Sequence, residues 1–147
     1  MDKLLTLMIM IFLHCVADYW LQGILAEMKQ KAWWKDKEPK GLCAKDYRAA
    51  LAAHSFEWAF MIQMPILYDI YYKCWGFEKF CVLAVSVYVG MLILNTVSHC
   101  IIDSAKANDH SINLITDQLL HLMQIAITWG IYVLVIAGYW EWGTRWL

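Results

Sequence analysis

At 147 residues the chain is long enough for one compact unit and too short for two ordinary domains. Hydrophobic residues make up 61% of the sequence and charged residues only 17%. A soluble domain of this size could not cover so much apolar surface, so the composition predicts a membrane protein. The net charge of -1 gives no basic surface for a nucleic acid, and no nucleic-acid partner is expected.

Four stretches are long and apolar enough to cross a bilayer, which takes roughly 20 residues in a helix. They are residues 4–26, 49–72, 77–105 and 112–140. Gly23, Gly90 and Gly130 fall inside these stretches, where close packing between membrane helices tolerates glycine. Most Trp residues, Trp58 among them, are expected to form an aromatic belt near the span ends. The sequence therefore predicts an all-α fold: a single integral-membrane domain that is an up-down bundle of four helices.

The connection over residues 27–48 is the only long hydrophilic segment of the chain. Together with Lys106, it carries most of the twelve Lys and Arg residues. The positive-inside rule therefore predicts that this connection lies in the cytoplasm and that both termini lie outside. The first part of the connection is expected to be an amphipathic helix at the membrane interface, anchored by Trp33 and Trp34.

Two further expectations concern processing and oxidation. The first apolar stretch carries His14 and Asp18, so it should remain as a span and not be a cleaved signal. The five cysteines are an odd number, and most lie within apolar stretches, where cysteine packs as a small apolar side chain. No disulfide framework is therefore expected.

Ionisable residues inside membrane spans are costly, so each is a candidate for a functional site. The polar set is His14, Asp18 and Gln22 in the first span, His54 and Glu57 in the second, His99 and Asp103 followed by Lys106 in the third, and Asp117, Gln118 and His121 in the fourth. Residues four apart share one helical face. In an up-down bundle all of these positions also lie toward the same membrane face. Four helices should therefore bring histidines and aspartates together at the cytoplasmic end of the bundle.

Imidazole and carboxylate groups in this mixture suit a divalent metal: zinc first, with manganese or iron as alternatives. The candidate ligands are His14, Asp18, His54, His99, Asp103, Asp117 and His121. They outnumber the ligands of one tetrahedral zinc ion, so either two ions bind or some aspartates only orient the histidines. A metal-free proton or ion relay and a structural polar network remain open.

Other polar and sulfur groups in the spans are expected to have different roles. Gln22 and Gln118 should make hydrogen bonds at helix contacts. Cys15 and Cys100 each follow a candidate ligand directly, so they should point away from the site.

The segments HCVADYWLQ, SHCIIDSAK and TDQLLHL, which carry most of the polar set, resemble an uncharacterised family of small membrane proteins from phages and bacteria. The similarity covers nearly the whole chain. It implies a four-span protein of the bacterial inner membrane, often of phage or mobile-element origin, and it brings no established activity. The pattern is also similar in its logic to membrane-embedded zinc hydrolases of the ceramidase and receptor-like type, which is an analogy of chemistry alone.

The leading hypothesis from the sequence is a metal-dependent hydrolase that acts on a lipid or lipid-linked phosphate at the cytoplasmic leaflet. The four histidines would bind the metal together with Asp103 or Asp117. Asp18 would act as ligand or general base, and Asp117 is likewise a candidate catalytic group. Lys106 would hold the anionic head group of the substrate.

Two alternatives remain open. A small ion or metal transporter or channel would use the same groups, but the outer halves of the spans have few ionisable residues to continue a path. A phage-encoded protein that modulates a host membrane protein would use the basic connection as its contact surface and the metal as a structural element. Membrane lipid or a host membrane protein is the expected partner, and assembly into a homo-oligomer is compatible with each hypothesis.

Overall fold

The computed structural model of the chain describes residues 2–37, 43–74 and 78–144, and every regular element in these ranges is a helix. The helices are α1 (Lys3–Cys15), α2 (Leu25–Met28), α3 (Lys31–Lys37), α4 (Tyr47–Cys74), α5 (Glu78–Ala107), α6 (Leu114–Ile131) and α7 (Gly138–Thr144). Two π-helical segments, η1 (Val16–Leu21) and η2 (Tyr132–Ala137), extend α1 and join α6 to α7. The described ranges thus form four long helical segments, and the all-α prediction is confirmed.

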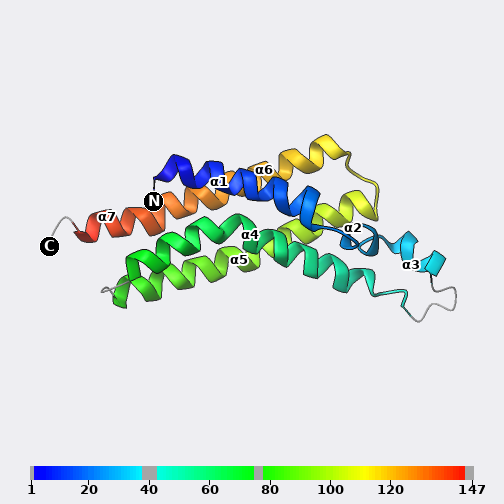
Figure 1. The fold of residues 1–147 in the computed structure, drawn as a ribbon, viewed down its shortest axis with the longest axis horizontal. Coiled ribbons are helices and arrows are strands. Elements are labelled where there is room, and N and C mark those ends of the chain that lie inside the picture. The colour runs from blue at the N-terminus through cyan, green and yellow to red at the C-terminus, as the bar shows by residue number, and fades with distance from the viewer. Residues whose placement is uncertain (1, 38–42, 75–77, 145–147) are drawn as a thin grey trace.

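The four long segments run alternately in opposite directions (Figure 1). Helices α4 and α5 lie side by side as an antiparallel pair, and α1 packs against both α4 and α6. The start of α1 and the end of α7 lie at one end of the bundle. The connections from α1 to α4 and from α5 to α6 lie at the opposite end, which brings the C-terminal part of α1 and η1 close to the start of α6.

Among the described residues, three helical stretches are long and apolar enough to cross a membrane. They are Lys3–Leu21, Cys81–Ala107 and Leu114–Trp142, with mean hydropathies of 1.9, 2.0 and 2.0. Helix α4 has the length of a span, at 28 residues, but it is not among the three. It contacts α1, η1, α2 and α5, and it buries polar side chains such as Gln63 and Asp69 between them. Enclosure by neighbouring helices lets α4 carry polar groups that lower its hydropathy.

Side-chain caps start two of the long segments. The carboxylate of Asp2 accepts a hydrogen bond from the backbone N–H of Leu5, at 2.9 Å. The side chain of Asn113 accepts one from the backbone N–H of Thr116, also at 2.9 Å. Each cap satisfies one of the backbone donors that the first turn of a helix leaves without a partner.

Gly23 ends the first long segment. Its φ of 47° is a left-handed conformation, which glycine adopts without the steric cost of a Cβ and which commonly terminates helices. The segment therefore stops at Leu21, before the expected boundary at residue 26. The expectation that Gly23 lies inside a helix is wrong, whereas Gly90 and Gly130 lie inside α5 and α6 as expected.

The first part of the connection from α1 to α4 contains the expected helix, as α3. Both of its tryptophans are held by hydrogen bonds from the indole Nε1. Trp34 donates to the backbone oxygen of Met28 at 2.7 Å, and Trp33 donates to Glu27 Oε2 at 2.9 Å. These bonds fold α3 back against the residues around α2, so the two short helices form one unit at this end of the bundle.

A disulfide bond joins Cys74, at the end of α4, to Cys81, near the start of α5. The expectation of no disulfide is therefore wrong. Two antiparallel helices joined by a short connection bring residues on either side of it together. The Cα atoms of this pair, seven residues apart in the sequence, are 5.1 Å apart. Of the other cysteines, Cys15 is exposed and Cys100 is half-buried, and neither belongs to the His/Asp cluster described below.

The bundle interior is largely apolar in its middle, apart from buried polar residues such as Gln63 and Asn95, and polar toward the end that carries α2 and α3. Buried apolar residues such as Met10, Ile62, Ile66 and Ile125 pack in the middle of the bundle. Toward the α2–α3 end, imidazole and carboxylate groups take the place of apolar side chains on all four long segments. Trp58 is fully buried in the bundle interior, so its expected place in an aromatic belt is wrong.

Candidate metal centre

Six of the seven predicted ligands converge in the bundle interior. Three groups of buried residues each bring their ligand atoms within 4.8 Å of one another. The groups are Asp18 with His54 and His99, His99 with Asp103 and His121, and Asp18 with Asp117 and His121. These residues come from η1, α4, α5 and α6, so every long segment contributes to the cluster.

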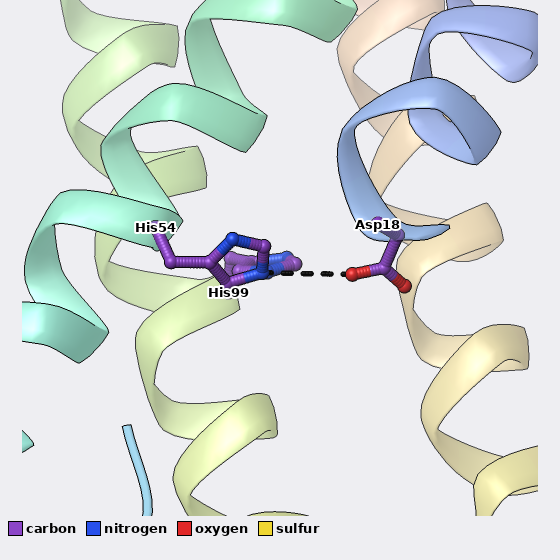
Figure 2. Close-up of side chains that lie close together, drawn as sticks. All are labelled: Asp18, His54 and His99. Atoms are coloured by element: carbon purple, nitrogen blue, oxygen red, sulfur yellow. Dashed lines mark hydrogen bonds and ion pairs between the residues drawn. The ribbon is translucent and has the colours of Figure 1, made fainter. Parts of the chain in front are cut away.

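The first half of the cluster lies around His54 and His99 (Figure 2). Their Nε2 atoms are 3.3 Å apart. Asp103 Oδ2 lies 3.4 Å from His54 Nε2 and 3.6 Å from His99 Nε2, and Asp18 Oδ1 lies 3.6 Å from His54 Nε2. Ligands of a tetrahedral metal ion with bonds of about 2.0–2.1 Å lie about 3.3 Å apart. The three pairwise distances among His54 Nε2, His99 Nε2 and Asp103 Oδ2 therefore fit one metal ion.

The second half of the cluster lies around His121. Its Nε2 is 3.4 Å from Asp103 Oδ1 and 3.5 Å from Asp117 Oδ1. Both His121 Nε2 and Asp117 Oδ1 are buried and have no hydrogen-bond partner in the described part of the chain. A buried polar atom without a partner is costly. A cation between the two atoms would satisfy both, so the donor set here also fits a metal.

Asp103 connects the two halves. Its Oδ2 lies near the first pair of histidines, and its Oδ1 lies near His121. The four-residue spacing of His99 and Asp103 on α5, and of Asp117 and His121 on α6, places each pair on one helical face. That part of the arrangement follows from the sequence.

Ring stacking holds the histidines of the cluster. The indole of Trp58 stacks on the imidazole of His99, with ring centroids 4.3 Å apart. His99 in turn stacks on His121, at 4.2 Å. The Nδ1 atoms of these two histidines have no hydrogen-bond partner among the described residues, so stacking sets the orientation of the rings. Sequence reasoning missed this role of Trp58 because one tryptophan in an apolar stretch gives no sign of its partners.

His14 lies beside the cluster and not within the three groups. Its Nδ1 accepts a hydrogen bond from Trp58 Nε1 at 2.9 Å, and its Nε2 lies 3.2 Å from Gln118 Oε1. Both ring nitrogens thus have partners other than the predicted ligand atoms. The π-helical segment η1 begins directly after Cys15, so Asp18 lies on a wider turn than an α-helix has. The expectation that His14 and Asp18 share one helical face assumes a regular α-helix. The chain is not a regular α-helix between these two residues.

Two glutamines hold Asp18. Gln118 Nε2 donates to Asp18 Oδ2 at 2.9 Å, across the contact between α6 and η1, as predicted for a helix-contact residue. Gln22 Nε2 donates to Asp18 Oδ1 at 3.0 Å and to the Asp18 backbone oxygen, so it acts within its own segment and not between helices. Glu57, the other carboxylate considered on α4, is in none of the three groups of described residues.

Two lysines pair with carboxylates of the cluster. Lys29 Nζ lies 2.6 Å from Asp103 Oδ2, and Lys106 Nζ lies 2.6 Å from Asp117 Oδ2. The three carboxylates of the cluster outnumber these two ammonium groups by one, so one further positive charge, from a bound cation or from an imidazolium, balances the cluster. The sequence predicts Lys106 as a site residue, whereas it marks Lys29 only as one of the basic residues of the connection.

Lys29 contacts the cluster because the chain turns back toward the bundle after η1. The turn at Gly23 leads into α2, and Lys29 follows that helix. Asn108, just after α5, donates to the backbone oxygen of Lys29 at 3.1 Å and accepts from the backbone N–H of Lys31 at 2.8 Å. Lys29 is only 8% exposed. No local sequence signal identifies it, because the contact depends on a tertiary turn.

Polar groups continue through the bundle away from the cluster. Asn95 on α5 and Thr128 on α6 are joined by a hydrogen bond of 2.9 Å, and Gln124 Nε2 donates to Asn95 Oδ1 at 3.0 Å. Further along, Tyr132 donates to Asp69 Oδ2 at 2.8 Å. Asp69 is 1% exposed, and sequence reasoning overlooked it. The half of the bundle that lies away from the cluster is thus less apolar than expected.

The chain matches no protein-family model, no curated protein and no solved structure. Its resemblance to the small phage and bacterial membrane proteins therefore stays a prediction from the sequence. What the geometry supports is a helical protein with three candidate membrane spans and a buried His/Asp cluster that can hold a metal ion.

Proposed function

We propose that the chain is a membrane-embedded, metal-dependent hydrolase that acts on a lipid or lipid-linked phosphate at the cytoplasmic leaflet. The observation that carries this proposal is the position of Asp103 between two sets of ligand atoms, one around His54 and His99 and one around His121. Two metal ions sharing a carboxylate are a recurring arrangement in phosphatases and nucleases. Zinc is the first candidate, since imidazole and carboxylate ligands both suit it.

The proposed roles follow from the contacts. His54, His99 and His121 would hold the metal with Asp103 and Asp117. A bound divalent ion supplies a Lewis acid that activates water and neutralises charge on the reacting phosphate. Asp18 lies 3.6 Å from His54 and is oriented by Gln118, so it would take up the proton of the attacking water.

Lys106 would bind the phosphate of the substrate. The side chain of Lys106 is 36% exposed, whereas that of its partner Asp117 is fully buried. An ammonium group has three donors, and the ion pair with Asp117 accounts for one of them. The other donors are therefore available to an anionic head group at the end of the cluster.

Two independent features support a four-span protein of the bacterial inner membrane with its cluster at the cytoplasmic side. Basic residues gather in the connection from α1 to α4, as the positive-inside rule requires of a cytoplasmic segment. The Cys74–Cys81 disulfide lies at the opposite end of the bundle. Disulfides persist in the oxidising periplasm and are rare in the cytoplasm. Both features give the same orientation, with α4 as the span that completes the bundle.

The proposal is tested on protein purified gently in detergent. Elemental analysis should find metal bound in a stoichiometric amount, and a panel of phospholipids and lipid-linked phosphates should contain a hydrolysed substrate. Asp18→Asn should keep the metal and lose turnover, because an amide preserves the shape but cannot take a proton. Asp46→Asn, an exposed carboxylate in the connection, is the matched control and should retain turnover. Wild-type protein that holds metal but hydrolyses nothing in the panel contradicts the hydrolase.

A small metal or ion transporter is the second candidate, and the polar groups in the outer half of the bundle favour it. Asn95, Gln124 and Thr128 lie on the helical faces that carry the cluster, and Asp69 and Tyr132 lie further toward the opposite end. A path across a membrane needs polar groups at several depths. Metal uptake into liposomes by wild-type protein, reduced in Asn95→Leu, would favour transport over hydrolysis.

A further inference from the structure

One seam of the bundle, between α5 and α6, carries both the cluster and a groove. On α5, Asn95, His99 and Asp103 follow one another at four-residue spacing and so share one face. On α6, His121 and Thr128 lie seven residues apart, about two turns, and share the facing side. The same pair of helical faces therefore forms the cluster near one end and the groove in the middle of the bundle.

The groove has a volume of about 210 Å³. The apolar part of its walls comes from Met91 and Leu94 on α5 and from Ile127 and Ile131 on α6, and polar side chains such as Asn95 and Thr128 complete the lining. Leu94 is 65% exposed and Ile127 is 61% exposed, so the groove opens on the outer surface of two candidate membrane spans. In a membrane that surface faces lipid acyl chains.

Gln124 links the groove to the cluster. It lines the groove, it is 9% exposed, and its Nε2 donates to Asn95 Oδ1 at 3.0 Å. The nearest cluster residue along the helix is His121, about one turn away. The groove and the metal ligands are therefore neighbours on the same helical faces.

The depth of the groove relative to the cluster fits a lipid of one leaflet. Asp103 and Asn95 are eight residues apart on α5, which corresponds to about 12 Å along a helix. Half of the hydrocarbon thickness of a bilayer is about 15 Å. A phospholipid with its phosphate beside the cluster would therefore have the middle of an acyl chain at the level of the groove.

We infer that the groove between α5 and α6 binds one acyl chain of a phospholipid from the cytoplasmic leaflet and places its phosphate at Lys106 and the His/Asp cluster. This inference rests on the proposed function and names how its substrate enters: sideways from the membrane. The charge agrees with this occupant, since the cationic side chain of Lys106, 36% exposed, lies at the end of the seam where a phosphate would be.

The experiment uses phosphatidic acid that carries a photoreactive diazirine in the middle of one acyl chain. Full-length protein is reconstituted in phosphatidylcholine vesicles with a trace of this probe and illuminated, and the labelled peptides are identified by mass spectrometry. Labelling should concentrate on the middle of α5 and α6, and an excess of unlabelled phosphatidic acid should remove it. Labelling spread evenly over all lipid-facing helices, or insensitive to this competitor, overturns the inference.

Variants that fill the groove test whether the labelling depends on the groove itself. Leu94→Trp and Ile127→Trp enlarge two wall residues and should abolish the competed labelling. Ile93→Trp and Leu122→Trp change exposed residues of the same helices that do not line the groove, and they should label as wild type does. Competed labelling that survives in both groove variants contradicts the inference. Recovery of the Cys74–Cys81 disulfide in each variant confirms that it has folded.

Metal content and hydrolysis are measured on the same samples, so the two proposals can fail separately. Competed labelling of α5 and α6 in protein that hydrolyses no lipid supports the groove and contradicts the hydrolase. Hydrolysis without competed labelling supports the hydrolase and overturns the groove.

Lys106→Met should leave an uncharged diacylglycerol probe able to label the groove while reducing the labelling by phosphatidic acid. Lys73→Met, which removes a lysine of a similar ion pair at the other end of the bundle, is the control.

Discussion

At the scale of single residues, the neighbours of the two ring nitrogens distinguish the histidines of this bundle. His99 Nε2 lies within 3.6 Å of an aspartate oxygen and 3.3 Å from a second imidazole nitrogen. His14 has a donor at one nitrogen and a glutamine oxygen at the other. Both residues are buried and each precedes an aspartate by four positions, so the sequence treats them alike. Of these two histidines, only His99 has a ring nitrogen close to Asp103, the carboxylate that the two halves of the cluster share.

We therefore expect His99→Ala and His14→Ala to differ in metal content. His99→Ala should lose most of the bound metal because it removes a ligand. His14→Ala should retain the metal and lose some thermal stability, since it leaves the indole N–H of Trp58 without an acceptor. Elemental analysis of the purified variants measures the first effect, and thermal unfolding in detergent measures the second. The control is His110→Ala, an exposed residue in the connection from α5 to α6. Equal loss of metal in the two variants would show that His14 is a ligand.

At the scale of elements, the connection from α1 to α4 brings a buried cation to the cluster. The turn at Gly23 and the two hydrogen bonds of Asn108 hold this connection against the end of α5. The result is an ion pair between Lys29 and Asp103 in which both side chains are nearly buried, at 11% and 3% exposure. Two residues further on, Lys31 forms a longer ion pair of 3.6 Å with Asp109, and both side chains are exposed.

Lys29→Met and Lys31→Met make a matched pair for testing this contact. Removing one partner of a buried ion pair costs about 3–5 kcal/mol because the other charge stays buried. An exposed pair contributes about 0–1 kcal/mol. In metal-free protein, Lys29→Met should lower the thermal unfolding temperature clearly, and Lys31→Met should change it little. Added zinc should restore part of the loss in Lys29→Met, because a cation at Asp103 compensates the same charge. Equal unfolding temperatures for the two variants would contradict a stabilising role of Lys29.

At the scale of the whole molecule, the two ends of the bundle differ in chemistry. One end carries the basic connection, the cluster and its two lysines. The other end carries the Cys74–Cys81 disulfide and the ion pair of Lys73 with Asp69. Buried apolar residues of all four long segments lie between these ends. Such a difference between the two ends is typical of a membrane protein that has one fixed orientation.

The orientation can be checked by cysteine labelling in intact bacterial cells that express the protein. With the three other cysteines replaced by serine, a maleimide that does not cross the membrane should label Cys74 and Cys81 after brief reduction. A cysteine introduced by Lys35→Cys should be labelled only after the inner membrane is permeabilised. The physical reason is that basic segments stay in the cytoplasm whereas disulfides form outside it. Labelling of both positions from the same side would rule out the four-span arrangement.

The helical class and most of the candidate ligands follow from the order of residues along the chain. Apolar stretches of membrane-spanning length predict long helices, and the four-residue spacing of His99 with Asp103 and of Asp117 with His121 predicts shared faces. These inferences succeed because periodicity along a helix is a local property. The four long segments run in alternating directions, and this brings the polar residues of all four segments to one end of the bundle. The order of polar residues along the chain already indicated this.

Which side chains contact one another depends on the tertiary structure. The π-helical segment η1 changes the register between His14 and Asp18, and the left-handed turn at Gly23 sends Lys29 back to Asp103. The stacking of Trp58 on His99 and the Cys74–Cys81 disulfide likewise join different helices. Each of these contacts depends on where a second segment lies in space. Composition, hydropathy and spacing describe one segment at a time, so they carry no information about such pairs.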